Sequence, residues 1–295
     1  MTVTLFTLPK RFSGIYETIQ ENALQSWAAL QPKPEIILFG DEHGTRDAAR
    51  RHGTHHKPDL ATNSLGTPLV NHLFQTATKQ TSTPWQGFVN ADIILDPALP
   101  ALLDRIIAWR PRALIVSRRW DLDVAQPIDT SVPNWFESLA HRARTEGTLY
   151  SHHGMDLFVF PTGLLDHMPP FSIGWPGAKY DNWMVYAARR LGIPVVDITD
   201  AITLIHQNHP SGPGTANPAK AQEHWINLDH LGGHGCCFDI LDATHVVGSD
   251  GKIRRATRSR ELLRRDVFRL AQRFRYRFRS KFLGFRYAQK SEPGH

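Results

Sequence analysis

The sequence has few cysteines and no long apolar segment. Its two cysteines, Cys236 and Cys237, are adjacent, which argues against a structural disulfide framework and favours a reducing cytoplasm. No segment approaches the roughly 20 consecutive apolar residues that a membrane-spanning helix needs. Residues 1–6 have no basic stretch and too short an apolar run for a secretory signal peptide. We therefore expect a cytoplasmic protein without a membrane span.

Length and charge limit what the chain can be. At 295 residues with 41% apolar content, it can form one large domain or two small ones with a sizeable core. The net charge of +6 is unevenly distributed. Residues 251–295 hold 15 Lys and Arg against 3 Asp and Glu, a net +12, whereas residues 1–250 hold 19 against 25, a net −6. We therefore divide the chain into a mildly acidic body, residues 1–250, and a basic tail, residues 251–295.

Residues 87–95 carry the most informative pattern of the body. Apolar residues on both sides of Asn90 and Asp92 are typical of a buried strand that surfaces briefly to present a carboxylate. Asp96 and Pro97 then predict the N-cap and first turn of a helix. Because ligands of α/β sheets collect at the carboxyl ends of strands, Asp92 lies where a metal-bound phosphate would. A plain turn or cap residue is the alternative interpretation of Asp92.

Asn90-Ala91-Asp92 after an apolar run resembles the DxD-type motif of nucleotide-sugar-dependent glycosyltransferases of the GT-A fold, family-2-like and of bacterial type. In that family an acidic pair binds a divalent cation that bridges the donor's diphosphate. This chain departs from the motif because Asn90 stands at the first acidic position. A carboxylate with an amide oxygen still suits Mg²⁺ or Mn²⁺. The resemblance implies a GT-A-like, Rossmann-related α/β fold, a mixed central sheet flanked by helices.

The first forty residues are similar to the opening of that fold. Alternation over residues 3–8, a helical apolar stripe, and an apolar run over residues 35–41 predict a βαβ unit. The resemblance assigns Leu8 and Pro9, at the end of the first strand, and Asp41, at the end of the second, to the nucleotide site. A simple polar turn is the alternative for Asp41.

Two further segments add candidate donor contacts. Residues 59–68 are polar and rich in turn-forming residues, and the resemblance implies that Asn63 there belongs to the donor site. Residues 112–121 predict a strand that ends in charge. Its Arg118 and Arg119 suit a diphosphate because guanidinium groups match phosphate oxygens. Solvated arginines at the rim of the sheet are the alternative.

The acceptor side follows in the sequence. Residues 154–161 predict a strand that begins near Asp156, which the resemblance makes a candidate acceptor contact. The loop of residues 161–180 is long and has no predicted element, which is typical of functional or disordered segments. Because sugars stack on exposed rings, its aromatic residues favour a function. These residues are Phe171, Trp175 and Tyr180, and we name Trp175 as a substrate contact.

Asp181 begins a helical pattern directly after this loop. Asp181-Asn182-Trp183 resembles the catalytic-base segment of inverting GT-A enzymes, without the Glu that precedes the base there. The resemblance makes Asp181 the catalytic residue and Trp183 a substrate contact. The alternative is that Asp181 only caps the helix, and both roles are compatible.

A histidine completes the predicted metal site. The apolar run over residues 201–205 ends at His206, and GT-A enzymes frequently supply a metal ligand from a histidine near the C-terminus. The resemblance therefore assigns Asp92 and His206 to the metal, with His209 as the rival of His206. An imidazole ligand favours Mn²⁺ over Mg²⁺.

The basic tail predicts an amphipathic helix with arginines around an apolar stripe. The stripe comprises Leu263, Val267, Leu270, Phe274, Phe278 and Phe282. We rank three interpretations: residues 258–286 bind an anionic membrane surface, the stripe packs on the body, or the arginines bind nucleic acid. No nucleic-acid-binding motif is present and the acidic body would repel a polyanion, so we expect no nucleic acid partner.

Taken together, these features predict a glycosyltransferase that uses Mn²⁺ or Mg²⁺ and a nucleotide-sugar donor. Its acceptor would be a glycan, a lipid-linked molecule or a small hydroxyl compound, in the cytoplasm or at the inner face of the membrane. One alternative is a nucleotidyltransferase on a related sheet, which would need a Gly- and Arg-rich loop after the first strand. The other is a non-catalytic protein whose basic tail binds membrane or nucleic acid.

Overall fold

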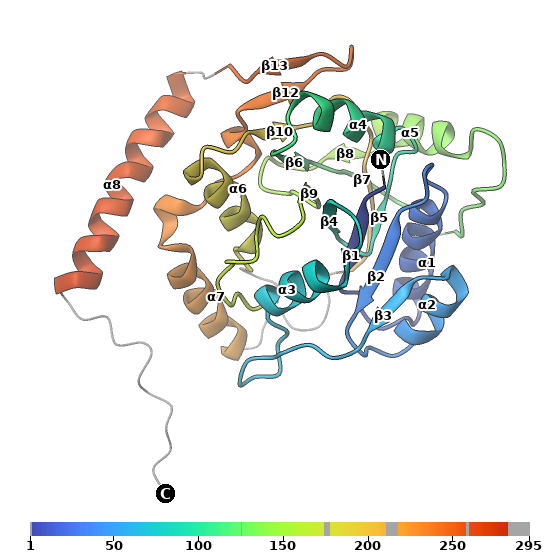
Figure 1. Cartoon of the computed structure of the whole chain (residues 1–295), viewed down its shortest axis with the longest axis horizontal. Coiled ribbons are helices and arrows are strands. Elements are labelled where there is room, and N and C mark those ends of the chain that lie inside the picture. The colour runs from blue at the N-terminus through green and yellow to red at the C-terminus, as the bar shows by residue number, and fades with distance from the viewer. Residues whose placement is uncertain (1, 125, 174–177, 211–217, 258–259, 283–295) are drawn as a thin grey trace, which may run out of the picture.

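A nine-stranded sheet runs through the centre of the protein (Figure 1). The computed structural model describes residues 2–124, 126–173, 178–210, 218–257 and 260–282. In spatial order the strands are β13 (Ile253–Arg255), β12 (His245–Val247), β10 (Val195–Asp197), β6 (Leu114–Ser117), β9 (Leu157–Pro161), β4 (Trp85–Val89), β1 (Thr4–Thr7), β2 (Glu35–Phe39) and β3 (His55–Lys57). Strand β9 is antiparallel to both its neighbours and β13 is antiparallel to β12, whereas the other pairs are parallel. The sheet is therefore mixed.

Helices cover both faces of this sheet (Figure 1). One face packs against α1 (Ile15–Ala28), α2 (Thr45–His52) and α4 (Leu99–Trp109), and the other against α3 (Val70–Gln80), α6 (Tyr180–Arg190) and α7 (Pro218–Leu231). Because side chains alternate along a strand, Leu5 of β1 enters the first core and Phe6 the second, and both are fully buried. Burial on both faces explains why these strands are continuous apolar runs in the sequence.

A second, four-stranded sheet lies beside the first. Its order is β5 (Ile93–Ile94), β11 (Ile205–Gln207), β7 (Trp120–Leu122) and β8 (Thr148–Leu149). Strands β11 and β7 are parallel, and the other two pairs are antiparallel. Helix α5 (Trp135–Thr145) contributes Phe136 and Ala143 to the small core under this sheet. This sheet matters because it connects the segment after β4 to the segment after β10.

The sequence predicted the mixed sheet with flanking helices, and the structure confirms it. The apolar runs of residues 87–95 and 112–121 each divide into two strands that join different sheets. The helix predicted to begin at Pro97 begins at Leu99, because the side chain of Asp96 accepts a hydrogen bond from the backbone N–H of Ala98 (2.8 Å) and forms a turn before the helix.

The chain ends, in its described part, with α8 (Arg260–Phe282), which lies at the edge of the body (Figure 1) and packs against the 3-10 helix η1 (His234–Cys236). The boundary predicted at residue 250 falls within a β-hairpin, because β13 pairs with β12 of the main sheet. None of the helices in the described ranges is both long enough and apolar enough to cross a membrane.

Candidate active site

The turn after β4 carries Asp92. The backbone N–H of Ile93 donates to the carbonyl of Asn90 (3.2 Å) and closes the turn. The indole of Trp27 donates to the carbonyl of Ile93 (2.8 Å), and the side chain of Gln207 donates to the carbonyl of Asp92 (3.2 Å). Helix α1 and strand β11 thus hold the turn from two sides. Asp92 lies just beyond the carboxyl end of β4.

Strand β11 brings two histidines to this turn. In its pairing with β5, His206 lies opposite Ile93, and in its pairing with β7, His206 lies opposite Asp121. The Nε2 atom of His206 lies 3.7 Å from Oδ2 of Asp92, and its Nδ1 atom lies 3.0 Å from Oδ1 of Asp121. After the strand, Nε2 of His209 lies 3.3 Å from the same Oδ2 atom of Asp92. The two histidines that the sequence presented as rivals both face Asp92.

Asp92, His206 and His209 form a group that fits a divalent cation. One ligand atom from each side chain lies within 4.8 Å of the others. Oδ1 of Asp92 is buried and has no hydrogen-bond partner among the described residues. Since buried polar atoms are nearly always hydrogen-bonded, this oxygen is available to a ligand. One carboxylate and two imidazoles suit Mn²⁺ better than Mg²⁺, because Mg²⁺ prefers oxygen ligands.

Asp156 lies beside this group, with its charge balanced by Arg119. The carboxylate is only 3% exposed, and its Oδ1 accepts hydrogen bonds from Asn90 (2.6 Å) and Arg119 (2.7 Å). Arg119 also donates to Asp121 (2.9 Å), and its guanidinium carbon lies 4.3 Å from the centre of the Tyr150 ring. Oδ2 of Asp156 is buried without a partner in the described part of the chain. It can therefore accept a hydrogen bond from a substrate.

Burial and neighbouring charges shift the pKa values of these groups in ways that suit metal binding. Burial alone would raise the pKa of Asp92, but the hydrogen bond with His209 and the charges of His206 and Lys10 outweigh burial and lower it. Burial lowers the pKa of His206. At neutral pH Asp92 is therefore ionised and His206 neutral, which are the forms that bind metal ions. Burial raises the pKa of Asp156.

Asp181 lies in the first turn of α6. The N-cap of this helix is Lys179, with φ of 62°, so the interpretation of Asp181 as the N-cap residue is wrong. Its Oδ1 accepts a hydrogen bond from the backbone N–H of Asn182 (2.8 Å). Burial raises the pKa of Asp181 to about 6, although that hydrogen bond and the charge of Lys179 oppose the shift. Such a carboxyl is ionised at pH 7 and still basic enough to accept a proton.

Three predicted nucleotide contacts lie at the same edge of the sheet as Asp92. Leu8 and Pro9 follow β1 and Asp41 follows β2, and β1 is parallel to both β2 and β4. Leu8 is partly buried, Pro9 is buried and Asp41 is exposed. A φ of +84° at Gly40 turns the chain sharply after β2 and leaves Asp41 at the surface.

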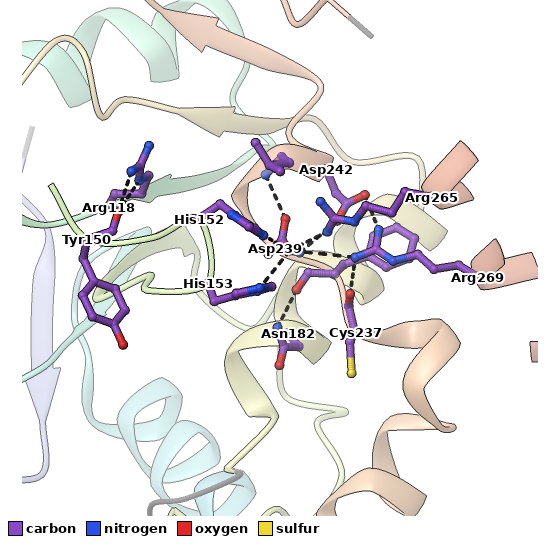
Figure 2. A network of polar contacts seen from close by, with 12 residues as sticks. Arg118, Tyr150, His152, His153, Asn182, Cys237, Asp239, Asp242, Arg265 and Arg269 are labelled. Atoms are coloured by element: carbon purple, nitrogen blue, oxygen red, sulfur yellow. Dashed lines mark hydrogen bonds and ion pairs between the residues drawn. The ribbon is translucent and has the colours of Figure 1, made fainter. Parts of the chain in front are cut away.

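Asn63 and Arg118 make contacts away from this group. The side-chain oxygen of Asn63 accepts hydrogen bonds from two backbone N–H groups of its own loop (2.9 and 3.0 Å), and its amide donates to Glu223 (2.6 Å). Arg118 donates from Nε to the carbonyl of Tyr150 (2.9 Å; Figure 2). Neighbouring side chains point in opposite directions here, so Arg119, and not Arg118, contacts the carboxylates of Asp121 and Asp156. The side chain of Asn63 is thus engaged in hydrogen bonds that fix its own loop, and not in a free position for a nucleotide-sugar donor.

The aromatic residues predicted to contact a sugar differ in how far the structure exposes them. Phe171 is fully buried, so the expectation that its ring is exposed is wrong. Trp183 is 7% exposed and packs in the same core, with the two ring centres 6.2 Å apart. This burial leaves Trp183 little surface on which a sugar could stack. Trp175 lies outside the described residues.

The structure adds two residues near the histidines that sequence reasoning missed. The ring centre of Tyr16 lies 5.1 Å from that of His209, and Nζ of Lys10 lies 4.6 Å from the centre of the Tyr16 ring. Lys10 also acts on the charge of Asp92. The basic pair Lys10-Arg11 directly after β1 was the available sequence signal. Nothing in the local sequence indicated Tyr16.

Comparisons with known proteins agree with this fold. No protein-family model matches the sequence, and no curated protein matches it closely. The structure resembles that of S. aureus TarS 1–349 in complex with UDP-GlcNAc, with a TM-score of 0.51 and 15% identity over 78% of this chain. This chain spans 66% of that TarS chain, slightly less than two thirds. M. tuberculosis glucosyl-3-phosphoglycerate synthase matches with a TM-score of 0.46 and 15% identity, over 80% of each chain. On its structural similarity to TarS, and with its mixed sheet and flanking helices, the protein has the fold of the GT-A glycosyltransferases.

Proposed function

We propose that this protein is a metal-dependent glycosyltransferase that transfers a sugar from a nucleotide-sugar donor to a hydroxyl acceptor. The observation that carries the proposal is the convergence of Asp92, His206 and His209 beyond the carboxyl ends of the strands. This is where ligands of α/β sheets bind. Together with the GT-A fold, it supports a bound cation that faces a donor diphosphate. The likeness to TarS supports a nucleotide sugar as donor.

Each residue of the site has a distinct chemical task in this proposal. A divalent cation held by Asp92, His206 and His209 would, when bound, supply positive charge to the leaving diphosphate. Lys10 adds a second positive charge near the site, since its charge acts on Asp92. Arg119 keeps Asp156 in place and leaves one buried oxygen of that carboxylate free to orient a hydroxyl group.

Asp181 is the proposed base. With its pKa at about 6, it is ionised at neutral pH and can take the proton of the acceptor hydroxyl in an inverting transfer. The charge of Asp156, which lies beside the proposed metal group, also acts on Asp181, and this supports a base near that group. The acceptor class we propose comprises glycans, lipid-linked molecules and small hydroxyl compounds, with the cytoplasm as the place of action.

Donor binding is the first expected result. In a thermal-shift panel with Mn²⁺, at least one nucleotide sugar should raise the melting temperature of the full chain. A ligand at 100 times its dissociation constant adds about 2.7 kcal/mol to the free energy of unfolding, or roughly 5–10 °C for a protein of this size. The same panel with EDTA is the control and should show a smaller rise. If no nucleotide sugar stabilises the protein with any divalent metal, the proposal is wrong.

A further inference from the structure

Helix α8 attaches to the body through its arginines (Figure 2). Arg269 is only 6% exposed, and its NH1 atom donates to Oδ1 of Asp242 (2.6 Å). Arg265 pairs with Asp239 and lies 3.2 Å from Oδ2 of Asp242. The guanidinium carbon of Arg269 also lies 4.6 Å from the centre of the Phe238 ring. Two cationic side chains of the tail are thus paired with two buried carboxylates of the body.

The two carboxylates are held in place by their own helix. Asp239 is the N-cap of the short 3-10 helix η2 (Ile240–Asp242), and Asp242, its last residue, completes a capping box with Asp239. Asp239 accepts from the backbone N–H of Leu241 (3.0 Å), and Asp242 accepts from the backbone N–H of Asp239 (2.9 Å). His153 lies 3.3 Å from Asp239, but the two arginines already balance this carboxylate, so the position does not suit a metal ion. The two carboxylates are therefore fixed in position and bind the arginines of α8.

The backbone of α8 comes very close to the body at Gly235, which lies in the 3-10 helix η1 (His234–Cys236). A Cβ atom at position 235 would lie 2.6 Å from the carbonyl oxygen of Arg269, closer than real Cβ atoms approach. Only glycine permits this approach. The close approach at Gly235 and the ion pairs together indicate that α8 is attached to the body in one fixed position.

The apolar side of α8 is largely exposed, although Val267 and Leu270 also line a hollow with Arg189 and Phe238 of the body. Its members repeat at steps of four, three and four residues, which places them on one side of a helix. Leu263, Val267, Leu270 and Phe274 are 51%, 70%, 65% and 74% exposed. For these four residues the second-ranked interpretation, that the stripe packs on the body, is therefore wrong; the side chains of Phe278 and Phe282 lie outside the described part of the chain. Arg269, which is buried, and Arg265, which is partly buried, lie on the other side of the helix, so α8 is amphipathic with its polar side inward.

We infer that this apolar side of α8 is a fixed membrane-docking surface that binds the interface of an anionic bilayer. Charge selects this occupant, because residues 251–295 carry a net +12 and Arg275 of the same helix is exposed. Basic residues are attracted to an anionic membrane, and an apolar stripe inserts at the boundary between headgroups and acyl chains. A second copy of the chain would bring the same positive charge and be repelled. The surface goes beyond the proposed catalytic function and does not depend on it.

The test measures binding of the full chain to phosphatidylcholine vesicles with and without 30% phosphatidylserine. We expect co-sedimentation with the anionic vesicles that weakens as salt is raised. The double variant Leu270→Ser with Phe274→Ser keeps the charge and should bind at least tenfold more weakly with an unchanged melting temperature. Leu191→Ser, at a side chain 51% exposed on the body, is the matched control and should bind like the wild type. The inference would be overturned if the double variant bound anionic vesicles as tightly as the wild type. It would also be overturned if the wild type bound no vesicles but formed dimers that the double variant abolished.

A second variant tests whether the attachment is fixed. Arg269→Gln leaves Asp242 buried without its closest cation, and breaking a buried ion pair is strongly destabilising. The melting temperature should fall by roughly 10 °C, whereas Arg275→Gln, at an exposed position of the same helix, should leave it nearly unchanged. Equal melting temperatures for Arg269→Gln and the wild type would mean a loose tail and contradict the fixed surface.

Discussion

Replacing Asp92 with alanine is expected to weaken Mn²⁺-dependent nucleotide binding by at least 100-fold, or about 2.8 kcal/mol. Asp92 provides the negative charge of the proposed metal group, and its Oδ2 is the atom that both histidines face. Neutral imidazoles alone would hold the cation poorly beside a diphosphate. The backbone carbonyl of Asp92, which accepts from Gln207, is unaffected by the change, so the turn should persist. Isothermal titration with UDP and Mn²⁺ measures the effect.

The control for this change is Asp129→Ala, which removes an exposed carboxylate from a surface turn. It should bind the nucleotide like the wild type. His209→Ala should lie between the two, because His206 and Asp92 remain as ligands. Equal nucleotide affinity of wild type and Asp92→Ala in the presence of Mn²⁺ would refute the metal assignment.

Replacing Asp181 with asparagine is expected to retain donor binding and to lower turnover by about 10²- to 10⁴-fold, the usual contribution of a general base. Asparagine keeps the size of the side chain and its oxygen can still accept from the N–H of Asn182, but it cannot take a proton. An unchanged donor affinity with a lower kcat is the mark of a group that acts in the transition state. A variant with wild-type turnover would exclude Asp181 as the base.

The pH profile separates this role from a structural one. Wild-type turnover should rise with pH, reach half its maximum near pH 6 and level off at higher pH, because only ionised Asp181 accepts a proton. Charges of Lys179 and Asp156 act on Asp181, and Cys237 lies within its electrostatic reach. Since its pKa is raised in the folded protein, ionisation costs stability as pH rises toward and past 6. Asp181→Asn should therefore not lower the melting temperature at pH 7.5, and its residual rate should lack the rise near pH 6.

Much of the main sheet could be predicted from the sequence. Strands that are buried on both faces leave continuous apolar runs, and the runs of residues 3–8 and 35–41 correspond to β1 and β2 with α1 between them. The division of residues 87–95 into β4 and β5 was not predicted, because both halves are equally apolar. The partner of β5 is β11, more than a hundred residues away, and no local pattern encodes that pairing.

Only part of the site could be predicted, because local sequence patterns do not show which distant strands pair. Asp92 follows a recognisable strand, so its position at the sheet edge could be inferred. The sequence alone leaves His206 and His209 as rivals, because it does not show the pairing of β11 with β5 and β7 that brings both to Asp92. In the sequence, Asp121 is only the end of a predicted strand. Its approach to His206 depends on the second sheet, which the sequence did not reveal.

The tail shows a different limit. Its helical pattern was predicted correctly, but the sequence left open whether the apolar stripe stays exposed or packs on the body. Arginines are usually exposed, so local patterning does not predict that the helix contacts the body through them. Arg269 is buried and Arg265 partly buried because Asp239 and Asp242 offer fixed charges on the body. Such an arrangement depends on partners more than twenty residues away, which amphipathic periodicity cannot indicate.

The most direct test of the account is to locate Mn²⁺ in crystals grown with MnCl₂ and UDP, by anomalous diffraction near the manganese edge. We expect a peak bonded to Oδ1 or Oδ2 of Asp92 and to imidazole nitrogens of His206 and His209, with the remaining positions taken by diphosphate oxygens. Bound UDP at the carboxyl ends of β1 and β4 with this peak absent, or a peak at other residues, would contradict the proposed site.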